Sequence, residues 1–144
     1  DEDVAKAFLA AGLIGAFIAT EWTFAAEVGG CQAEGGSAAA MAGAALVTLS
    51  GGDTPQACAA ASMAMQSMLG LICDPIANRV EAPCLGKNVL AATNALSCAN
   101  MALAGFEQVI PFDEVVDAAK PLRLLDTLVA VVPLPIVCDA VEVP

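Results

Sequence analysis

Histidine is absent from this chain of 144 residues, and so is tyrosine. Without histidine the chain itself contains no Ser–His–Asp triad, no Cys/His zinc finger and no histidine-ligated metal. Cations are also scarce, because 5 lysine and arginine residues stand against 16 aspartate and glutamate residues, for a net charge of −11. Phosphate backbones are bound by clustered positive charge, so we expect no nucleic-acid partner.

Apolar runs of membrane-spanning length are lacking as well, although 58% of the residues are hydrophobic. The longest run, from Ala7 to Ala19, is shorter than the roughly 20 residues that cross a bilayer. Glu21 and Glu27 follow it, and no lysine- or arginine-rich flank supplies an orientation signal. We therefore expect a buried core helix here and no membrane span.

Cysteine is present but sparse. The 6 cysteines are too few for a small scaffold held together by disulfides. We find no signal peptide with a basic start and a small-residue cleavage site. We therefore expect reduced thiols and a cytoplasmic location.

Helical spacing dominates the rest of the pattern, and no stretch alternates apolar and polar residues for long enough to predict a sheet. Gly51-Gly52 is typical of a helix end, and Asp53-Thr54-Pro55 is typical of an N-cap followed by proline. The sequence predicts one all-α domain over residues 1–144, a compact bundle of five to six alanine-rich helices with irregular cysteine-bearing loops. The helices that we predict cover residues 3–20, 32–50, 54–69, 85–104, 113–120 and 123–132.

Three of the cysteines, Cys31, Cys73 and Cys84, lie in loops or at predicted helix starts, whereas Cys58 and Cys98 lie inside predicted helices. A helix start lowers the pKa of a thiol, and thiolate is the form that binds iron. The spacing lacks the paired Cys-x-x-Cys knuckles of a zinc ribbon. Three thiolates would leave one iron of a four-iron cluster open as a Lewis acid. Position alone leaves ligation and core packing equally open for the first three, and favours packing for the other two.

The segments around these three cysteines carry a family resemblance. They read Gly-Gly-Cys31-Gln-Ala-Glu34, Gly70-Leu-Ile-Cys73-Asp-Pro75 and Glu81-Ala-Pro-Cys84-Leu-Gly-Lys-Asn88. Over residues 7–120 the chain resembles the C-terminal half of the α chain, or catalytic domain, of bacterial iron–sulfur L-serine dehydratases.

This resemblance implies a [4Fe–4S] cluster held by Cys31, Cys73 and Cys84, with its open iron facing L-serine. It implies α,β-elimination of L-serine to pyruvate and ammonia, a step of amino-acid degradation, without pyridoxal phosphate. The open iron would make the serine hydroxyl a better leaving group.

Four further side chains take their expected roles from the same resemblance. Lys87 and Asn88 stand where the family usually has Arg-Asn, and are expected to contact the cluster or the substrate. Gln32 and Glu34 are expected to support the first ligand. The alternatives are that Glu34 caps the helix beside it and that Lys87 is a solvated side chain.

The chain also departs from the family. The family's α chain is longer, and neither its histidine-containing first half nor the β or regulatory portion is matched here, so we expect the proton-abstracting residue and a partner domain or subunit to lie elsewhere in a homo- or hetero-oligomer. Residues 121–144 diverge from the family, and Cys138 is a speculative fourth ligand. The alternative function is a cluster-binding or structural subunit, or fragment, that has no lyase activity on its own.

Overall fold

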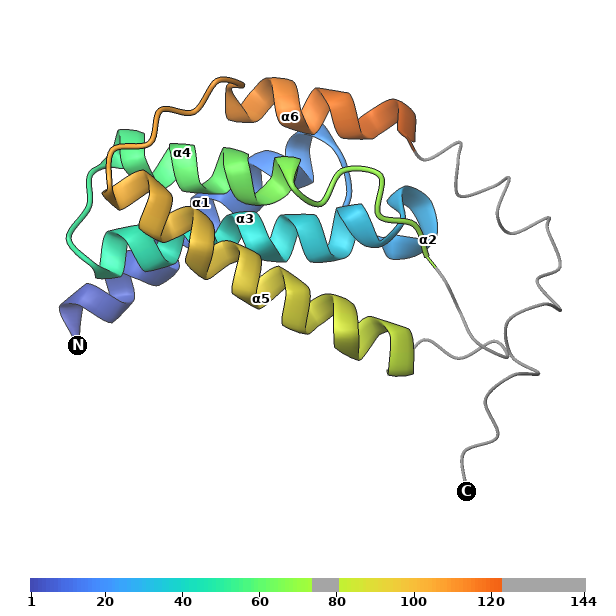
Figure 1. The fold of residues 1–144 in the computed structure, drawn as a ribbon, viewed down its shortest axis with the longest axis horizontal. Helices are drawn as coiled ribbons and strands as arrows, with labels where there is room; N and C mark the ends of the chain where they lie inside the picture. The colour runs from blue at the N-terminus through green and yellow to red at the C-terminus, as the bar shows by residue number, and fades with distance from the viewer. Residues whose placement is uncertain (74–80, 123–144) are drawn as a thin grey trace, which may run out of the picture.

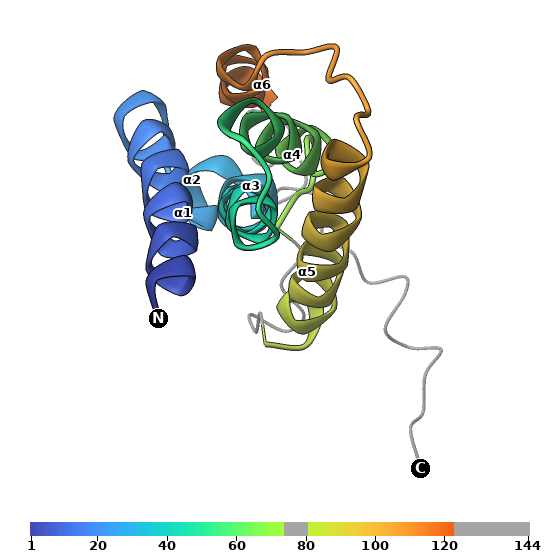
Figure 2. The same cartoon turned by 90° about the vertical axis from the view of Figure 1, so that its left-hand side faces the viewer.

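The computed structural model describes residues 1–73 and 81–122, and every regular element in these two ranges is helical. The predicted all-α fold is therefore confirmed. Four longer helices and one short one pack around a central helix, and Figures 1 and 2 show the arrangement from two sides. The elements are α1 (Glu2–Glu21), α2 (Ala26–Gly29), α3 (Cys31–Leu49), α4 (Thr54–Gln66), α5 (Glu81–Leu103), α6 (Phe112–Ala119) and the 3-10 turn η1 (Lys120–Leu122).

The central helix is α3, which packs against α1, α4 and α5. It occupies this place because most of its buried residues are alanine or glycine, so that neighbouring backbones approach closely. A Cβ atom added to Gly43 would lie 3.3 Å from the Ala60 carbonyl oxygen on α4. On the other side, a Cβ atom at Gly15 of α1 would lie 3.0 Å from the Met41 Cε atom of α3.

The start of α4 follows the predicted cap. The Asp53 carboxylate accepts a hydrogen bond from the Gln56 backbone N–H at 2.9 Å, and the Gln56 side-chain oxygen accepts one from the Asp53 N–H at 3.0 Å. Pro55 stands in the first turn, where its missing N–H costs nothing. The Gln56 amide nitrogen also donates to the Ala102 carbonyl at 3.3 Å, which joins α4 to α5.

Two boundaries differ from the predictions. The helix α5 begins at Glu81 rather than Leu85, so Cys84 lies inside its first turn. Pro83 does not prevent this, because a proline near the start of a helix loses no intrahelical hydrogen bond. Residues 25–30, predicted as a break, contain the single turn α2. The predicted helix at 123–132, the divergent tail and Cys138 lie outside the described residues.

The prediction that α1 is a buried core helix is wrong for one face. Ile14 and Ile18 are buried, but Phe8, Leu9 and Leu13 are 74%, 72% and 72% exposed. The helix runs over 20 residues, which makes it long and apolar enough to cross a membrane, with 22% of its most apolar window buried. A single helix of this kind is weak evidence of a span, because core helices and signal sequences have the same length and composition.

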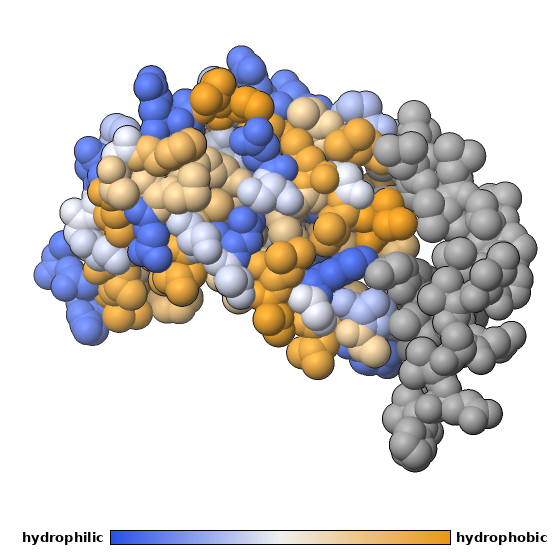
Figure 3. Space-filling view, in the orientation of Figure 1, coloured by the Kyte–Doolittle hydropathy of each residue, from blue (hydrophilic) through white to orange (hydrophobic). Residues whose placement is uncertain are grey.

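Apolar side chains also reach the surface elsewhere. Figure 3 shows apolar surface over the face of the molecule that carries α5. The exposed large apolar side chains of this helix are Leu85, Val89, Leu90, Leu96 and Met101. A groove between α1 and α3 is lined entirely by apolar residues, namely Val4, Ala7, Phe8, Ala45, Leu46 and Leu49.

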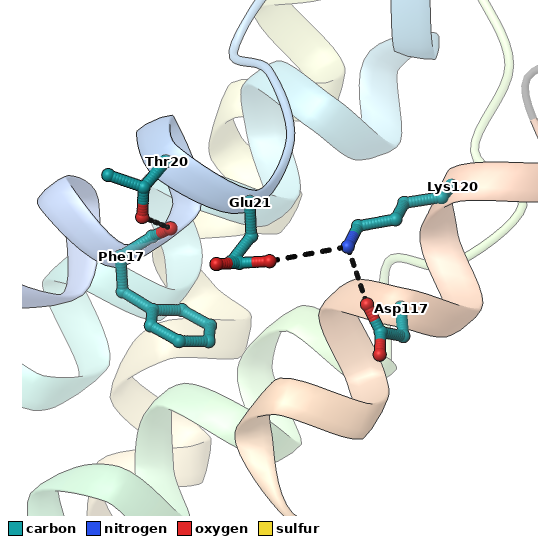
Figure 4. Close-up of polar contacts among 5 residues, drawn as sticks. All are labelled: Phe17, Thr20, Glu21, Asp117 and Lys120. Atoms are coloured by element: carbon teal, nitrogen blue, oxygen red, sulfur yellow. Dashed lines mark hydrogen bonds and ion pairs between the residues drawn. The ribbon is translucent and has the colours of Figure 1, made fainter.

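The last described helix, α6, covers one edge of the bundle through its buried Val115 and Val116. The rings of Phe17 and Phe112 pack with their centroids 5.6 Å apart. Beyond the helix end, the Lys120 ammonium lies 3.6 Å from the Glu21 carboxylate (Figure 4). The C-terminal ends of α1 and α6 are thus held together.

Candidate functional site

Two glycines, Gly29 and Gly30, form the turn that places Cys31 in the site. Gly30 has φ 74° and ψ −179°, a conformation that in practice only glycine adopts. A Cβ atom at Gly29 would lie 2.7 Å from the Trp22 ring, so a larger residue does not fit there. The turn places Cys31 as the first residue of α3, where its side chain is 4% exposed.

Cys73 lies in the segment that follows Gly70, close enough to Cys31 to raise the pKa of the Cys31 thiol. The backbone of this segment runs beside the start of α3, because the Gln32 N–H donates to the Leu71 carbonyl at 2.9 Å. Two of the three candidate cysteines, 42 residues apart in sequence, are therefore in contact.

Cys31 shares a pocket with Cys84 and with the three predicted polar residues Glu34, Lys87 and Asn88. The start of α3 and the first turns of α5 enclose a small pocket with about 200 Å³ free of protein atoms, part of it open to solvent. Its lining residues are Cys31, Glu34, Gly35, Cys84, Lys87 and Asn88. The structure thus brings together six of the seven residues that the sequence singled out, with Cys73 beside Cys31, whereas the side chain of the seventh, Gln32, hydrogen-bonds to Gly70 and Ala119.

Lys87 is the polar centre of this group. Its ammonium donates to the Ile72 carbonyl at 2.5 Å and to the Cys31 sulfur at 3.4 Å. Lys87 is half-buried, so the solvated alternative is wrong for this side chain. It connects α5 both to the Cys73 segment and to the start of α3.

Glu34 and Asn88 stand at the exposed rim of the pocket. Glu34 lies in the first turn of α3, and the N-cap residue of this helix, Gly30, makes no side-chain cap. The Asn88 amide donates to the Cys84 carbonyl of its own helix at 2.9 Å.

The electrostatics of Cys31 differ from what a helix start alone predicts. Burial raises the pKa of its thiol, and the neighbouring Cys73 adds to the rise. The Lys87 ammonium lowers the pKa but does not outweigh the burial. In the metal-free chain the thiol form is favoured, and forming the thiolate depends on positive charge brought close to the sulfur.

Within residues 1–73 and 81–122, no three cysteine or carboxylate side chains gather tightly enough to hold a single metal ion. An iron–sulfur cluster requires more widely spaced ligands than a single ion does, because its thiolates bind different irons and surround a body of several atoms. Cysteine sulfur is the ligand that such clusters take; Cys31 and Cys84 line one pocket, and Cys73 lies beside Cys31. The donor set therefore fits a cluster better than a single ion.

The other two described cysteines fall where packing was predicted. Cys98 is 4% exposed on α5, and its thiol donates to the Asn94 side-chain oxygen at 3.5 Å. The Asn94 amide in turn donates to the Ala64 carbonyl of α4 at 2.7 Å. Cys58 is half-buried within α4. Neither takes part in the pocket.

Comparison with known proteins decides the family. The family model for the serine dehydratase alpha chain matches residues 1–125. The chain belongs to this family. A serine dehydratase α chain of Peptoniphilus asaccharolyticus, named L-serine dehydratase, alpha chain, is 50% identical over 115 residues, which cover 80% of this chain and 39% of that protein.

Two further relatives carry the name probable L-serine dehydratase, alpha chain. That of Latilactobacillus sakei is 47% identical over 123 residues, or 85% of this chain and 59% of that protein. That of Bacillus subtilis is 44% identical over 117 residues, or 81% and 39%. The predicted family is confirmed, and this member spans between 39% and 59% of these relatives' length. The cluster and the placement in the C-terminal half remain predictions.

Proposed function

We propose that this chain is the cluster-binding part of an iron–sulfur L-serine dehydratase, a cytoplasmic lyase that needs no pyridoxal phosphate. Cys31, Cys73 and Cys84 would hold a [4Fe–4S] cluster, and L-serine would be converted to pyruvate and ammonia. The observation that carries the proposal is that Cys31 and Cys84 line one pocket while Cys73, from a third segment, lies beside Cys31. The relatives named L-serine dehydratase support the substrate.

A cluster with three protein ligands supplies an open iron, which acts as a Lewis acid on the serine hydroxyl. The chain's own residues would prepare the site for it. Lys87 places positive charge 3.4 Å from the Cys31 sulfur, which stabilises the thiolate needed for ligation. The same ammonium fixes the Ile72 carbonyl and so holds the Cys73 segment in place.

Glu34 and Asn88 would serve the substrate. Both lie at the open rim of the pocket, where the charged ends of an amino acid would enter. A carboxylate attracts the substrate's ammonium group, and a side-chain amide can bind its carboxylate. We assign the removal of the α-proton to a base in the part of the family's α chain that this chain does not span, and expect that part and a β or regulatory partner in the working oligomer.

A second candidate function is a cluster-binding or structural subunit that has no lyase activity by itself. Two observations favour it for the chain alone: the absence of histidine and the coverage of 39% of two α-chain relatives. The two functions differ in whether the rest of an α chain restores the reaction.

Anaerobic reconstitution with iron and sulfide tests the cluster. We expect charge-transfer absorbance and bound iron in the parent, and loss of both in Cys31→Ser, Cys73→Ser and Cys84→Ser. Cys58→Ser is the matched control, because this cysteine lies in a helix away from the pocket. A parent that takes up no cluster, or one whose spectrum survives the three substitutions, would sink the ligand assignment.

Pyruvate formation from L-serine tests the chemistry, with the reconstituted chain alone and with the remainder of a family α chain added. We expect activity only with the remainder present, and its loss in Cys84→Ser. Lyase activity that tolerates Cys84→Ser would overturn the mechanism. Absence of activity in both mixtures, with the cluster in place, would favour the second candidate function.

A further inference from the structure

Gln32, the residue after Cys31, is a buried polar side chain in a region of small apolar ones. It is 2% exposed, one of three buried polar residues among those that the structure describes. Burying an amide is costly unless both its oxygen and its nitrogen find partners. Its partners therefore show what the side chain does.

Those partners lie on two other segments rather than beside Cys31. The Gln32 side-chain oxygen accepts a hydrogen bond from the Gly70 N–H at 2.9 Å. The side-chain nitrogen donates to the Ala119 carbonyl at the end of α6, at 3.4 Å. The Gln32 backbone N–H also donates to the Leu71 carbonyl, so Gln32 holds two successive residues, Gly70 and Leu71, at the start of the Cys73 segment.

The packing around Gln32 makes this reach possible. A Cβ atom at Gly35 of α3 would lie 3.1 Å from the Met68 Cε atom, so glycine here lets the Met68 side chain of the turn after α4 pack directly on α3. Gly70 then turns the chain with φ 81°, which aims its N–H at the glutamine. The chain enters the Cys73 segment from this fixed point, three residues before the thiol.

We infer that Gln32 is a positioning residue that sets the separation of the Cys31 and Cys73 sulfurs by fixing the Gly70–Leu71 backbone to the start of α3, with α6 tied to the same point through Ala119. That this separation serves to hold a cluster rests on the proposed function. The separation itself is a property of the metal-free chain.

A matched control is present in the same molecule. The Gln56 side chain makes the same two kinds of contact, accepting from the Asp53 N–H at 3.0 Å and donating to the Ala102 carbonyl at 3.3 Å. These contacts join α4 to α5 away from the cysteine pocket. Replacing either glutamine by methionine, which is similar in shape, removes two hydrogen bonds to backbone groups.

The test is cross-linking of Cys31 to Cys73 in metal-free protein whose other cysteines are replaced by serine. Dibromobimane reports it, because the reagent fluoresces strongly only after both its bromides have been displaced by nearby thiolates. We expect Gln32→Met to slow the cross-link roughly tenfold, the effect of losing hydrogen bonds of ordinary strength that order the pair. We expect Gln56→Met to leave the rate unchanged, although both variants lose stability.

An unchanged rate in Gln32→Met, or an equal loss in Gln56→Met, would overturn the inference. No metal is used, so a failure of cluster reconstitution would refute the proposed function and leave this inference standing.

Discussion

Replacing Gly30 by alanine is expected to destabilise the start of α3. Gly30 has φ 74° and ψ −179°, and a residue with a Cβ atom held in that region is strained by on the order of 1–3 kcal/mol. For a chain of this size each kcal/mol corresponds to roughly 4 °C in Tm. Urea denaturation followed by far-ultraviolet circular dichroism measures the free energy of unfolding directly.

Gly12→Ala is the control for this substitution. Gly12 lies within α1, and a Cβ atom there would meet nothing within 4 Å. Alanine is the better helix former, so this variant should gain about 0.5–1 kcal/mol. The two substitutions have opposite expected signs although the chemical change is the same. A Gly30→Ala protein as stable as the parent would refute the strain argument.

Three further predictions concern the core and the thiols. Ile18→Ala should lower the free energy of unfolding by about 2–5 kcal/mol, because Ile18 is 0% exposed and leaves a cavity; urea titration checks this. Lys87→Met should raise the pKa of the Cys31 thiol further, and therefore slow its alkylation by iodoacetamide near neutral pH, whereas Lys6→Met should not. Burial raises the pKa of Cys98 in the fold, so the unfolded chain loses that proton first, and stability should fall as the pH rises above about 8.5. Cys98→Ala should flatten this fall in urea titrations across the alkaline range.

Local signals in the sequence determined the helix boundaries well. Asp53 and Pro55 predict the start of α4 because a cap depends only on residues within one turn. The predicted start at residue 85 puts Pro83 just before the helix, whereas Pro83 lies in the first turn of α5. Proline is compatible with both positions, and no neighbouring residue distinguishes them.

Burial of α1 could not be predicted, because the helix is apolar on most of its circumference. Periodicity identifies a buried face by contrast with a polar one, and here Leu13 and Ile14 look alike in sequence. In the structure one is 72% exposed and the other is 9% exposed. The difference arises because α3 covers one face of this helix, while α6 contacts only its C-terminal part.

The candidate site was predicted residue by residue, but its internal connections were not. The motifs named Cys31, Cys73 and Lys87, and the structure joins all three through one ammonium and one thiol contact. The resemblance assigned Gln32 to the support of Cys31, whereas its side chain hydrogen-bonds to two other segments. Its contacts with Gly70 and Ala119 depend on how the helix ends meet, which spacing along the chain does not encode.

The small-residue centre of the bundle has a consequence for how such a sequence can evolve. A core of leucines can drift, because a larger side chain at one position is compensated by a smaller one opposite. At Gly43 the nearest atom to an added Cβ is the backbone carbonyl oxygen of Ala60, which no substitution makes smaller. Accepted changes there must move whole helices apart. We therefore expect substitutions among related sequences to accumulate on the outer face of α1 far more often than along α3.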